Sequence, residues 1–394
     1  MDLNVLEKWV NINSGSAHSA GLERMTRALE IRLADLPGTV ERIPFPGQCD
    51  LDGSPIEPRD ALRLRFRPEA PLQVLLSGHL DTVYGSGHPF QKLEYLEESR
   101  ARGPGIADMK GGLFIMIEAL ETFLAEDRSG NLGGELIITA DEEIGSPLSK
   151  DLLRDAGRRH HAGLVFESAL PGGELVSRRL GSGLFRILAT GRAAHTGRDF
   201  KKGRNALVAL SEVVLACNEL NHLQPGVIVN VGRMNGGGPV NVVPDSAEAW
   251  VNVRIGEAEA APGLEAAFAE ILEGVEKSRE GITLRCEGGF VRPPKVESKA
   301  DARLHEIWNA AEIGLGLSPS GKRATGGGSD GNLLSAVGLP LLDGVGIKGG
   351  NIHSGEEFAF LESVPEQVRK TVAFLHALAA DPDAVRSLRQ KTIP

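Results

Sequence analysis

The sequence predicts an α/β protein into which a second, α+β domain is inserted, and three observations lead to this prediction. Short apolar runs alternate with amphipathic helices in the first part of the chain, as in a mostly parallel sheet with helices on both faces. From about Ser182 the order changes to strand–helix–strand–strand–helix–strand, which is typical of an α+β sandwich. Arg292-Pro293-Pro294 ends this pattern, and α/β alternation resumes. We therefore expect a first domain in two parts, 1–179 and 294–394, and an inserted domain, 180–293.

The first domain is expected to begin with helices and to continue with buried strands. Apolar residues at helical spacing predict helices over residues 5–10 and 22–33. The run Leu72-Gln73-Val74-Leu75-Leu76 is nearly continuously apolar and ends at Ser77-Gly78, as expected of a buried strand. By the same criteria we expect a helix over 112–124, a strand over 136–139, a helix over 148–156 and a strand over 163–166.

The inserted domain is expected to contain four strands and two helices. Partial alternation of apolar and polar residues predicts its first strand over residues 184–190. The elements that follow are a helix over 206–220, strands over 227–231 and 247–255, a helix over 264–277 and a strand over 282–286.

Composition places the chain among soluble globular proteins. Its 394 residues exceed the roughly 100–200 of a typical domain, so two domains are the natural expectation. The content of 41% hydrophobic and 24% charged residues is wrong for a disordered chain. Lys and Arg total 43 against 53 Asp and Glu, and the resulting net charge of −10 argues against a nucleic-acid partner.

The cysteines and the amino terminus bear on the compartment. Cys49, Cys217 and Cys286 lie far apart and form no CxxC pair, so they predict neither a disulfide framework nor a thiolate metal site. The start, Met1-Asp2-Leu3-Asn4, lacks the basic and apolar regions of a signal peptide. No segment reaches the roughly 18 apolar residues of a membrane span. We expect a cytoplasmic protein with no membrane partner.

Acidic residues and a histidine gather at the ends of the predicted elements. His79 and Asp81 come just after the strand at 72–76, and Glu167 directly follows the strand at 163–166. Asp141-Glu142-Glu143 follows the strand at 136–139, and Asp108 precedes a helix. Ligands of open α/β sheets bind at the carboxyl ends of strands, so three of these four segments point to one edge of the sheet.

Each of these segments, taken alone, has an ordinary structural explanation. A histidine after a strand is usually a hydrogen-bonded histidine, Asp-Glu-Glu is favourable charge at a helix amino terminus, and Asp108 is a suitable N-cap. Together, three or four carboxylates in one crevice would repel one another and take up protons unless a cation neutralised them. Two divalent metals joined by a bridging carboxylate would provide that neutralisation.

Seven segments of the chain occur together in an order that carries more information than any single motif. They are His79-Leu80-Asp81-Thr82-Val83, Gly103 to Gly112, Asp141 to Ser146, Phe166-Glu167, Arg192 to Gly197, Gly326 to Asp330 and Ile352-His353-Ser354. In this set the chain resembles the co-catalytic zinc amidohydrolases and exopeptidases, above all the bacterial glutamate carboxypeptidase branch. The family also includes acetylornithine deacetylase, succinyl-diaminopimelate desuccinylase, aminoacylase and tripeptide aminopeptidase. The resemblance spans nearly the whole chain and implies a zinc-exopeptidase-like mixed sheet flanked by helices, with an inserted ferredoxin-like lid and dimerisation domain.

The resemblance implies two Zn²⁺ per chain, with Co²⁺ or Mn²⁺ as alternatives. One metal would be held by His79, Asp108 and Glu167, and the other by Asp108, Glu143 and His353, so that Asp108 bridges them. Glu142 would be the general base, and Asp81 would orient His79. The family also places a cis peptide bond after the bridging aspartate, here Asp108–Met109.

The resemblance also implies a set of substrate-binding residues. His195 would reach across a homodimer interface to stabilise the oxyanion in the partner's active site, although on its own it is equally explained as a turn histidine. Asn241 and Arg254 match lid residues that hold the oxyanion or the substrate carboxylate, and a solvated strand charge is the alternative for Arg254. The amides of Gly327 and Gly328 would hold a carboxylate, and Arg292 lies where the glutamate carboxypeptidase branch has an arginine.

The predicted function is a metal-dependent hydrolase that cleaves a peptide or amide bond adjacent to a free carboxylate, in a small peptide or an N-acyl amino acid. An N-acyl-amino-acid deacylase, similar to acetylornithine deacetylase, is the alternative. Arg178 and Arg179 occupy the region where the glutamate carboxypeptidase branch has a lysine, which leaves the side-chain specificity open. A non-catalytic binding protein of the same fold would have lost a ligand or the base, and none is lost. A nucleotide-binding GxGxxG at 326–331 lacks the clear preceding strand that such a loop needs.

Overall fold

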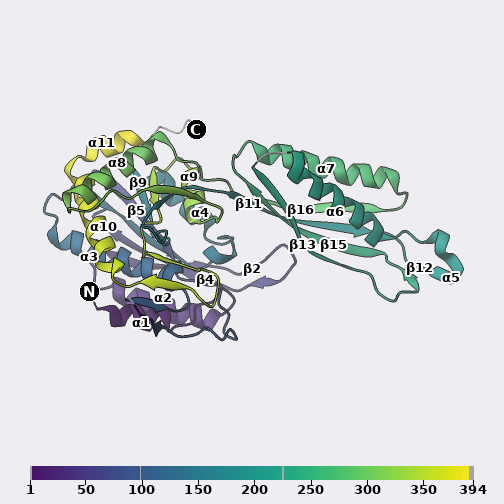
Figure 1. The fold of residues 1–394 in the computed structure, drawn as a ribbon, viewed down its shortest axis with the longest axis horizontal. Coiled ribbons are helices and arrows are strands. Elements are labelled where there is room, and N and C mark those ends of the chain that lie inside the picture. Colours follow the sequence, from purple (N-terminus) through teal and green to yellow (C-terminus); the bar gives the residue numbers. More distant parts are fainter. Residues whose placement is uncertain (1, 98, 224–225, 390–394) are drawn as a thin grey trace. The chain divides into compact units, whose positions relative to one another are not determined.

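The computed structural model describes residues 2–97, 99–223 and 226–389 and divides the chain into two compact units (Figure 1). The larger unit comprises Met1–Gln48, Pro55–Arg179 and Lys295–Pro394, and the inserted unit comprises Cys49–Ser54 and Leu180–Pro294. The sequence prediction assigned residues 49–54 to the first domain. The structure groups them with the inserted unit because they make long-range contacts there, described below.

The larger unit is built on a mixed six-stranded sheet. Its four strands β8, β5, β9 and β18 are parallel, whereas β1 and β4 extend one edge in antiparallel fashion. The sheet order is β1 (Thr39–Phe45), β4 (Arg59–Phe66), β8 (Leu132–Thr139), β5 (Leu72–His79), β9 (Ala162–Val165) and β18 (Leu341–Asp343). This architecture confirms the predicted fold class.

Helices cover both faces of this sheet, as the apolar sequence of β5 requires. Val74 and Leu76 of β5 belong to the large core that includes α3, whereas Leu75 belongs to a second cluster with side chains of α4 and α9. A strand that is buried on both faces needs apolar residues at successive positions, and each fully buried aliphatic side chain contributes about 1.5–3 kcal/mol. The helices are α1 (Leu3–Val10), α2 (Ser19–Leu33), α3 (Gly111–Glu126), α4 (Lys150–Arg159), α8 (Lys299–Gly314), α9 (Asp330–Ala336), α10 (Ser363–Ala380) and α11 (Pro382–Leu388).

Short elements complete the larger unit. A second sheet has the strand order β19, β20, β7, β6, and β10 pairs in parallel with β17. Their bounds are β6 (Glu94–Tyr95), β7 (Arg100–Arg102), β10 (Leu175–Arg179), β17 (Lys322–Thr325), β19 (Gly349–Gly350) and β20 (Phe358–Phe360). Within the part of the chain that the structure describes, no helix is both long enough and apolar enough to span a bilayer.

The inserted unit is a four-stranded antiparallel sheet with two long helices on one face (Figure 1). The sheet order β13-β15-β11-β16, with a helix after the first strand and another after the third, is the ferredoxin-like arrangement. The rings of Phe185 and Phe268 pack edge to face, 5.0 Å between centroids, in its core. The elements are β11 (Gly181–Thr190), α6 (Ala206–Leu223), β13 (Val227–Gly236), β15 (Ser246–Ile255), α7 (Ala260–Ser278) and β16 (Thr283–Arg292).

A hairpin from the first part of the chain packs on the inserted unit. Strands β2 (Gln48–Cys49) and β3 (Pro55–Ile56) pair with each other, and the residues between them form its tip. Arg186 donates to the backbone oxygen of Leu51 at 3.4 Å, and Arg233 lies 3.5 Å from the carboxylate of Asp52. These contacts cross more than 130 positions of sequence, so local patterns in the sequence gave no indication of them.

Candidate functional site

His79 is the last residue of β5, and its ring is oriented by the segment that follows. The side chain is 1% exposed, and its Nδ1 lies 3.0 Å from the backbone oxygen of Asp81 and 3.4 Å from the carboxylate of the same residue. A carbonyl oxygen accepts hydrogen bonds and cannot donate them, so Nδ1 carries a proton. Nε2 points to the carboxylate of Asp108, 3.1 Å away, and is the ring atom that would bind a cation.

Asp108 lies between two histidines. It belongs to the short π-helical turn η1 (Ile106–Lys110), and the Asp108–Met109 peptide bond is cis, which confirms that prediction. Its Oδ1 is 3.1 Å from Nε2 of His79, and its Oδ2 is 3.2 Å from Nε2 of His353. One carboxylate therefore faces a different imidazole with each oxygen, which is the arrangement of a bridging ligand.

Two glutamates follow β8 in the 3₁₀ turn η2 (Glu142–Ile144). Oε2 of Glu143 lies 3.2 Å from Nε2 of His353, while Oε2 of Glu142 lies 3.9 Å from Nε2 of His79. The carboxylate of Asp81 accepts the backbone N–H groups of Glu142 and Glu143 at 3.1 and 3.2 Å, and the hydroxyl of Ser16 at 2.8 Å. Asp81 therefore fixes the backbone of both glutamates as well as the ring of His79.

Glu167 and His353 complete the group. Oε1 of Glu167, two residues after the end of β9, lies 3.7 Å from Nε2 of His79. His353 lies in the loop between β19 and β20 with a φ of 61°, in the left-handed region that residues with a Cβ seldom adopt. The five predicted ligands, His79, Asp108, Glu143, Glu167 and His353, thus meet at the carboxyl end of the parallel strands.

Burial and mutual repulsion shift the titration of this group. Burial and the neighbouring Asp108 raise the pKa of Glu143 to about 8, and they raise the pKa of Glu167 well above its usual range. Hydrogen bonds to Asp108 and Glu143 raise the pKa of His353 to about 10. Burial alone would lower the pKa of His79, but the surrounding carboxylates raise it well above its ordinary value. Where no cation is bound, protons on these histidines and carboxylates therefore offset the repulsion between the negative charges.

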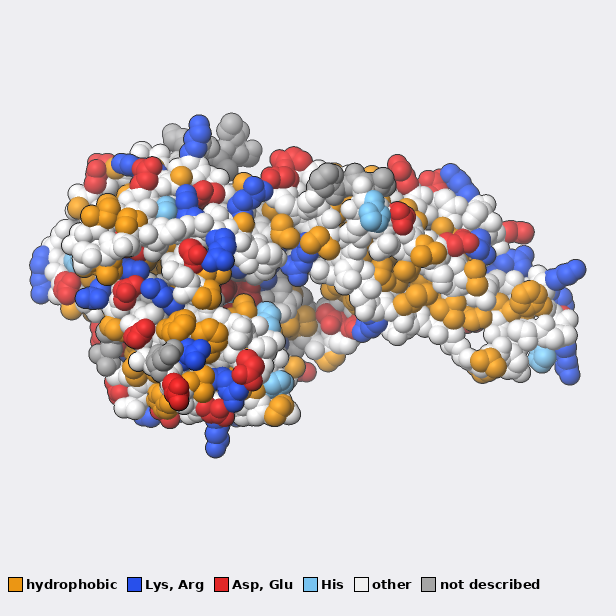
Figure 2. Space-filling view, viewed as in Figure 1, with side chains coloured by type: hydrophobic (Ala, Val, Ile, Leu, Met, Phe, Trp, Pro, Cys, Tyr) orange, Lys and Arg blue, Asp and Glu red, His pale blue; other side chains and the backbone are white. Residues whose placement is uncertain are grey.

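The residues predicted on the inserted unit lie in two separate regions. His195 ends the short strand β12 (Ala194–His195), which pairs with β14 (Val242–Val243), and its exposed ring accepts the N–H of Gly197 at 3.1 Å. The backbone oxygen of Asn241 accepts the N–H of Thr196 at 3.1 Å, so His195 and Asn241 lie close together. Lys and Arg side chains gather on the surface around the nearby helix α5 (Thr196–Asp199) (Figure 2).

Arg254 and Arg292 lie in the second of these regions. Ser182 of β11 pairs with Arg254 of β15 on one side and with Arg292 of β16 on the other. Burial and the positive charge of Arg292 lower the pKa of Arg254. Two guanidinium groups that flank one position of the sheet are suited to an anionic group such as a carboxylate.

The glycine loop is held by a buried ion pair that the sequence did not predict. Gly327 and Gly328 lie between β17 and α9, and the guanidinium of Arg179 reaches the backbone oxygen of Gly327 at 3.3 Å. The same guanidinium donates two hydrogen bonds of 2.7 Å to the carboxylate of Asp343. Arg179 is thus engaged within the larger unit, in the place where the glutamate carboxypeptidase branch was expected to have a lysine.

Other supporting residues were also missed. Asp330 accepts the hydroxyls of Thr139 and Ser146, and so joins α9 to both ends of the segment that carries Glu142. Glu357 accepts backbone N–H groups of the turn that carries Asp108. Only the proximity of Glu357 to His353 in sequence could have drawn attention to it, because all of these contacts are long-range.

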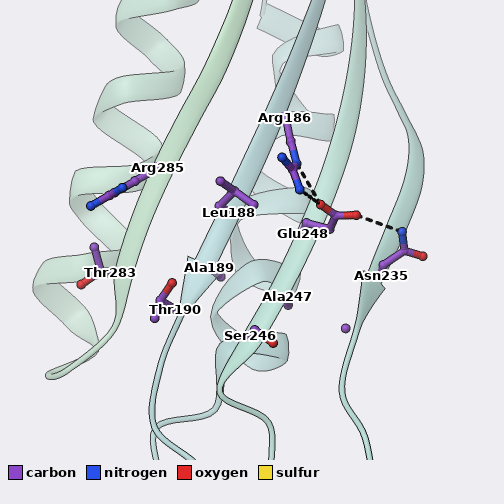
Figure 3. Close-up of a pocket in the computed structure, with 11 residues that line it drawn as sticks. Arg186, Leu188, Ala189, Thr190, Asn235, Ser246, Ala247, Glu248, Thr283 and Arg285 are labelled. Carbon is purple, nitrogen blue, oxygen red and sulfur yellow. Dashed lines mark hydrogen bonds and ion pairs between the residues drawn. The ribbon is translucent and has the colours of Figure 1, made fainter. Parts of the chain in front are cut away.

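A separate cavity of about 620 Å³ lies in the inserted unit (Figure 3). Strands β11, β13, β15 and β16 line it, and an ion pair of 2.7 Å joins Arg186 to Glu248. None of the predicted site residues is among its lining residues, which are Arg186, Leu188, Ala189, Thr190, Asn235, Gly236, Ser246, Ala247, Glu248, Thr283 and Arg285.

Comparison with known proteins identifies the family of the chain. Residues 75–381 match the model described as Peptidase family M20/M25/M40. The chain is 27% identical over 390 residues to carboxypeptidase G2 of Pseudomonas sp. (strain RS-16), which covers 96% of this chain and 89% of that relative. It is 29% identical over 363 residues to succinyl-diaminopimelate desuccinylase of Rhodospirillum centenum, covering 86% and 87% of the two chains.

Solved structures agree in fold. Bacillus subtilis YxeP, described as a dinuclear metal-binding peptidase from the M20 family, superimposes with a TM-score of 0.66 at 14% identity, covering 95% of this chain and 96% of that one. The chain therefore belongs to peptidase family M20/M25/M40 and is a hydrolytic enzyme of that family.

Proposed function

We propose that this hydrolase holds two divalent metals, which we infer to be Zn²⁺, and cleaves an amide bond adjacent to a free carboxylate, as a carboxypeptidase does. The observation that carries the proposal is the position of Asp108, whose two oxygens face two different histidines at 3.1 and 3.2 Å. Further carboxylates flank each of these histidines. Carboxylate and imidazole ligands suit Zn²⁺, and Co²⁺ and Mn²⁺ are the alternatives.

The residues present fit a pair of cations. His79, Asp108 and Glu143 each offer a ligand atom, and these atoms lie within 4.8 Å of one another. Oε1 of Glu143 is buried and has no hydrogen-bond partner among the described residues, as expected of an oxygen that a cation would satisfy. His79, Asp108 and Glu167 would hold one metal, and Asp108, Glu143 and His353 the other. Such a pair supplies Lewis-acid activation of water and of the scissile carbonyl.

Glu142 is the proposed general base. Its carboxylate is adjacent to this group, and the two backbone hydrogen bonds to Asp81 fix the turn that carries it. In this role Glu142 takes a proton from the attacking water and returns it to the nitrogen of the leaving amine. Asp81 acts through its contacts with His79 and with the turn, so it is a positioning residue.

Recognition of the substrate carboxylate is assigned to two sets of groups. Arg254 and Arg292 provide paired guanidinium groups on the inserted unit, and the amides of Gly327 and Gly328 provide donors on the larger unit. His195 of a second protomer would stabilise the developing oxyanion, which requires a homodimer. Asn241 would hold the oxyanion or the substrate carboxylate.

A second candidate is an N-acyl-amino-acid deacylase, favoured by the similarity to the desuccinylase. Both activities use the same chemistry and differ in what lies on the acyl side of the bond. A non-catalytic binding protein is disfavoured because Glu142 and all five ligands are present. A cytoplasmic location also stays a proposal.

The test is the release of free amino acid from a panel of N-acyl amino acids and dipeptides. The panel is run with zinc-loaded and with chelator-stripped protein in parallel. Zinc-dependent release supports the hydrolase, and the preferred substrate separates the peptidase from the deacylase. Failure to bind metal together with absence of release would overturn the site assignment.

A further inference from the structure

Glu357 is a completely buried acid four residues after His353, and the described residues include no Lys, Arg or His in ion-pair contact with it, although the charge of the buried Lys110 acts on it. Its carboxylate is instead surrounded by hydrogen-bond donors. Oε1 accepts the backbone N–H groups of Ala107 at 2.8 Å and Asp108 at 3.0 Å. Oε2 accepts the N–H of Gly105 at 3.1 Å and the hydroxyl of Tyr84 at 2.7 Å.

Three of these donors come from one tight turn, and that turn presents the central carboxylate of the site. Gly105, with a φ of 74°, precedes η1, and the N–H groups of the turn converge on Glu357 as they would on a bound anion. The backbone of Glu357 adds another contact, because its oxygen accepts the N–H of Gly103 at 3.2 Å. The direction in which Asp108 projects from the backbone is therefore set by Glu357.

The same residue holds the loop that carries His353. The N–H of Glu357 donates to the backbone oxygen of Ser354 at 3.1 Å, and the hydroxyl of Tyr84 lies 2.9 Å from that oxygen. His353 itself has a left-handed backbone, which is unfavourable for a residue with a Cβ and must be held by its surroundings. Glu357 thus connects Asp108 to His353.

The ligands on the other side of Asp108 have different supports. His79 ends the central strand β5, and its ring is held by Asp81. Glu167 lies two residues after the end of β9. Neither residue has a hydrogen bond to Glu357 among those of the described residues.

We propose that Glu357 is the positioning residue of the metal position formed by Asp108, Glu143 and His353. This inference rests on the proposed two-metal function. Residues that orient metal ligands typically contribute 10–100-fold to metal affinity. Loss of the Glu357 carboxylate should therefore weaken this position by 10–100-fold. The position of His79, Asp108 and Glu167 shares Asp108 with it and should weaken less, because His79 and Glu167 have other supports.

The decisive variant is Glu357→Gln, which keeps the shape but places an NH₂ group against backbone N–H donors. Glu356→Gln is the matched control, because the neighbouring Glu356 side chain is 70% exposed and pairs only with the surface residue Arg102 among the ion pairs of the described residues. Zinc affinity of each position is measured by competition with a chelator of known affinity, and metal content is measured after dialysis. Thermal unfolding of the metal-free proteins reports on folding.

We expect wild type and Glu356→Gln to bind two metals alike, and Glu357→Gln to bind one tightly and the second 10–100-fold more weakly. Its kcat should fall at limiting zinc and recover in excess zinc, with KM nearly unchanged. Two metals bound with wild-type affinity, or both positions weakened equally, would overturn the assignment to one position. A wild-type protein that binds fewer than two metals would overturn the proposed function itself, and this inference with it.

Tyr84→Phe provides an independent measurement if Glu357→Gln does not fold. It removes one donor to Oε2 of Glu357 and the contact with Ser354, and it leaves all three backbone donors in place. We expect a smaller loss, about 2–5-fold, at the same metal position. An unchanged second affinity in this variant would count against the proposal.

Discussion

Nε2 of His353 lies 3.2 Å from Oδ2 of Asp108, and in the metal-free protein a hydrogen bond joins these two atoms. Hydrogen bonds to Asp108 and Glu143 raise the pKa of His353 to about 10, and burial raises that of Glu143 to about 8. Both groups are therefore protonated at pH 7 in the metal-free protein, and metal must displace these protons. We expect zinc binding at pH 7 to release protons. The affinity should fall as the pH falls below about 10, where His353 takes up a proton, and more steeply below about 8, where Glu143 does so as well. Titration calorimetry in two buffers of different ionisation enthalpy measures the number released, and a value of zero would contradict the assignment.

The stability of the metal-free protein should also depend on pH. The folded pKa of His353, about 10, lies above its ordinary value of 6.5, so its contribution is complete below about pH 6.5 and is lost as the pH rises through 10. Glu143 acts in the same direction, because its pKa is raised from 4.5 to about 8. We expect the melting temperature of the metal-free protein to fall between about pH 5 and pH 10. A metal-free protein that became more stable over this range would show that the group does not hold protons.

Glu142→Gln should separate catalysis from metal binding. The change removes the proposed base and keeps the hydrogen bonds of its backbone, so kcat should fall by about 10²–10⁴-fold with two metals still bound. Glu143→Gln is the matched comparison on the adjacent residue, and it should lose metal from the position shared with His353. Steady-state rates and metal content are measured on the same samples. A fully active Glu142→Gln protein would remove Glu142 from the mechanism.

His195→Ala should abolish most activity without loss of metal, because His195 is exposed on the inserted unit and is proposed to act on a partner's site. Mixing it with Glu142→Gln tests this arrangement. In a two-fold symmetric dimer, each mixed dimer has one site with both residues intact, so complete exchange restores about a quarter of the wild-type activity. Absence of recovery after verified subunit exchange would rule out a shared site.

The pair formed by Arg179 and Asp343 should dominate the local stability of the larger unit. Both side chains are buried, and removing one partner of such a pair leaves an uncompensated charge. Arg179→Met should lower the free energy of unfolding by about 3–5 kcal/mol, and the double variant Arg179→Met/Asp343→Leu should recover most of the loss. Urea unfolding of the metal-loaded proteins measures both. A single variant that loses less than about 1 kcal/mol would show that the pair is solvated.

The fold and the candidate site could be predicted from the sequence to different extents. The nearly continuous apolar run at 72–76 predicted a buried strand, and β5 is buried on both faces, with Leu75 and Leu76 in different core clusters. The antiparallel edge strands β1 and β4 were not predicted, although Leu62, Leu64 and Phe66 of β4 alternate with two arginines, a pattern that is typical of a half-buried strand.

In the candidate site, too, some residues could be predicted from the sequence and others could not. Residues next to strand ends were recognisable because a strand fixes where its carboxyl end lies. The residues that hold the site together, such as Glu357 and Asp343, act through contacts between distant segments. Their charge alone does not distinguish them from the many surface acids of a chain with net charge −10.

Arg179 and Lys295 exchange backbone hydrogen bonds, each of 3.0 Å, at the point where the chain leaves the larger unit and returns to it. The 115 residues from Leu180 to Pro294 therefore begin directly after one residue of this hydrogen-bonded pair and end directly before the other. Because Arg179 and Lys295 hydrogen-bond to each other, an insertion of any length between them leaves the backbone hydrogen bonds of the larger unit intact. The inserted module could therefore be exchanged, enlarged or lost without breaking the sheet of the larger unit. Without the insertion, Leu51 and Asp52 of the hairpin tip would lose their contacts with Arg186 and Arg233.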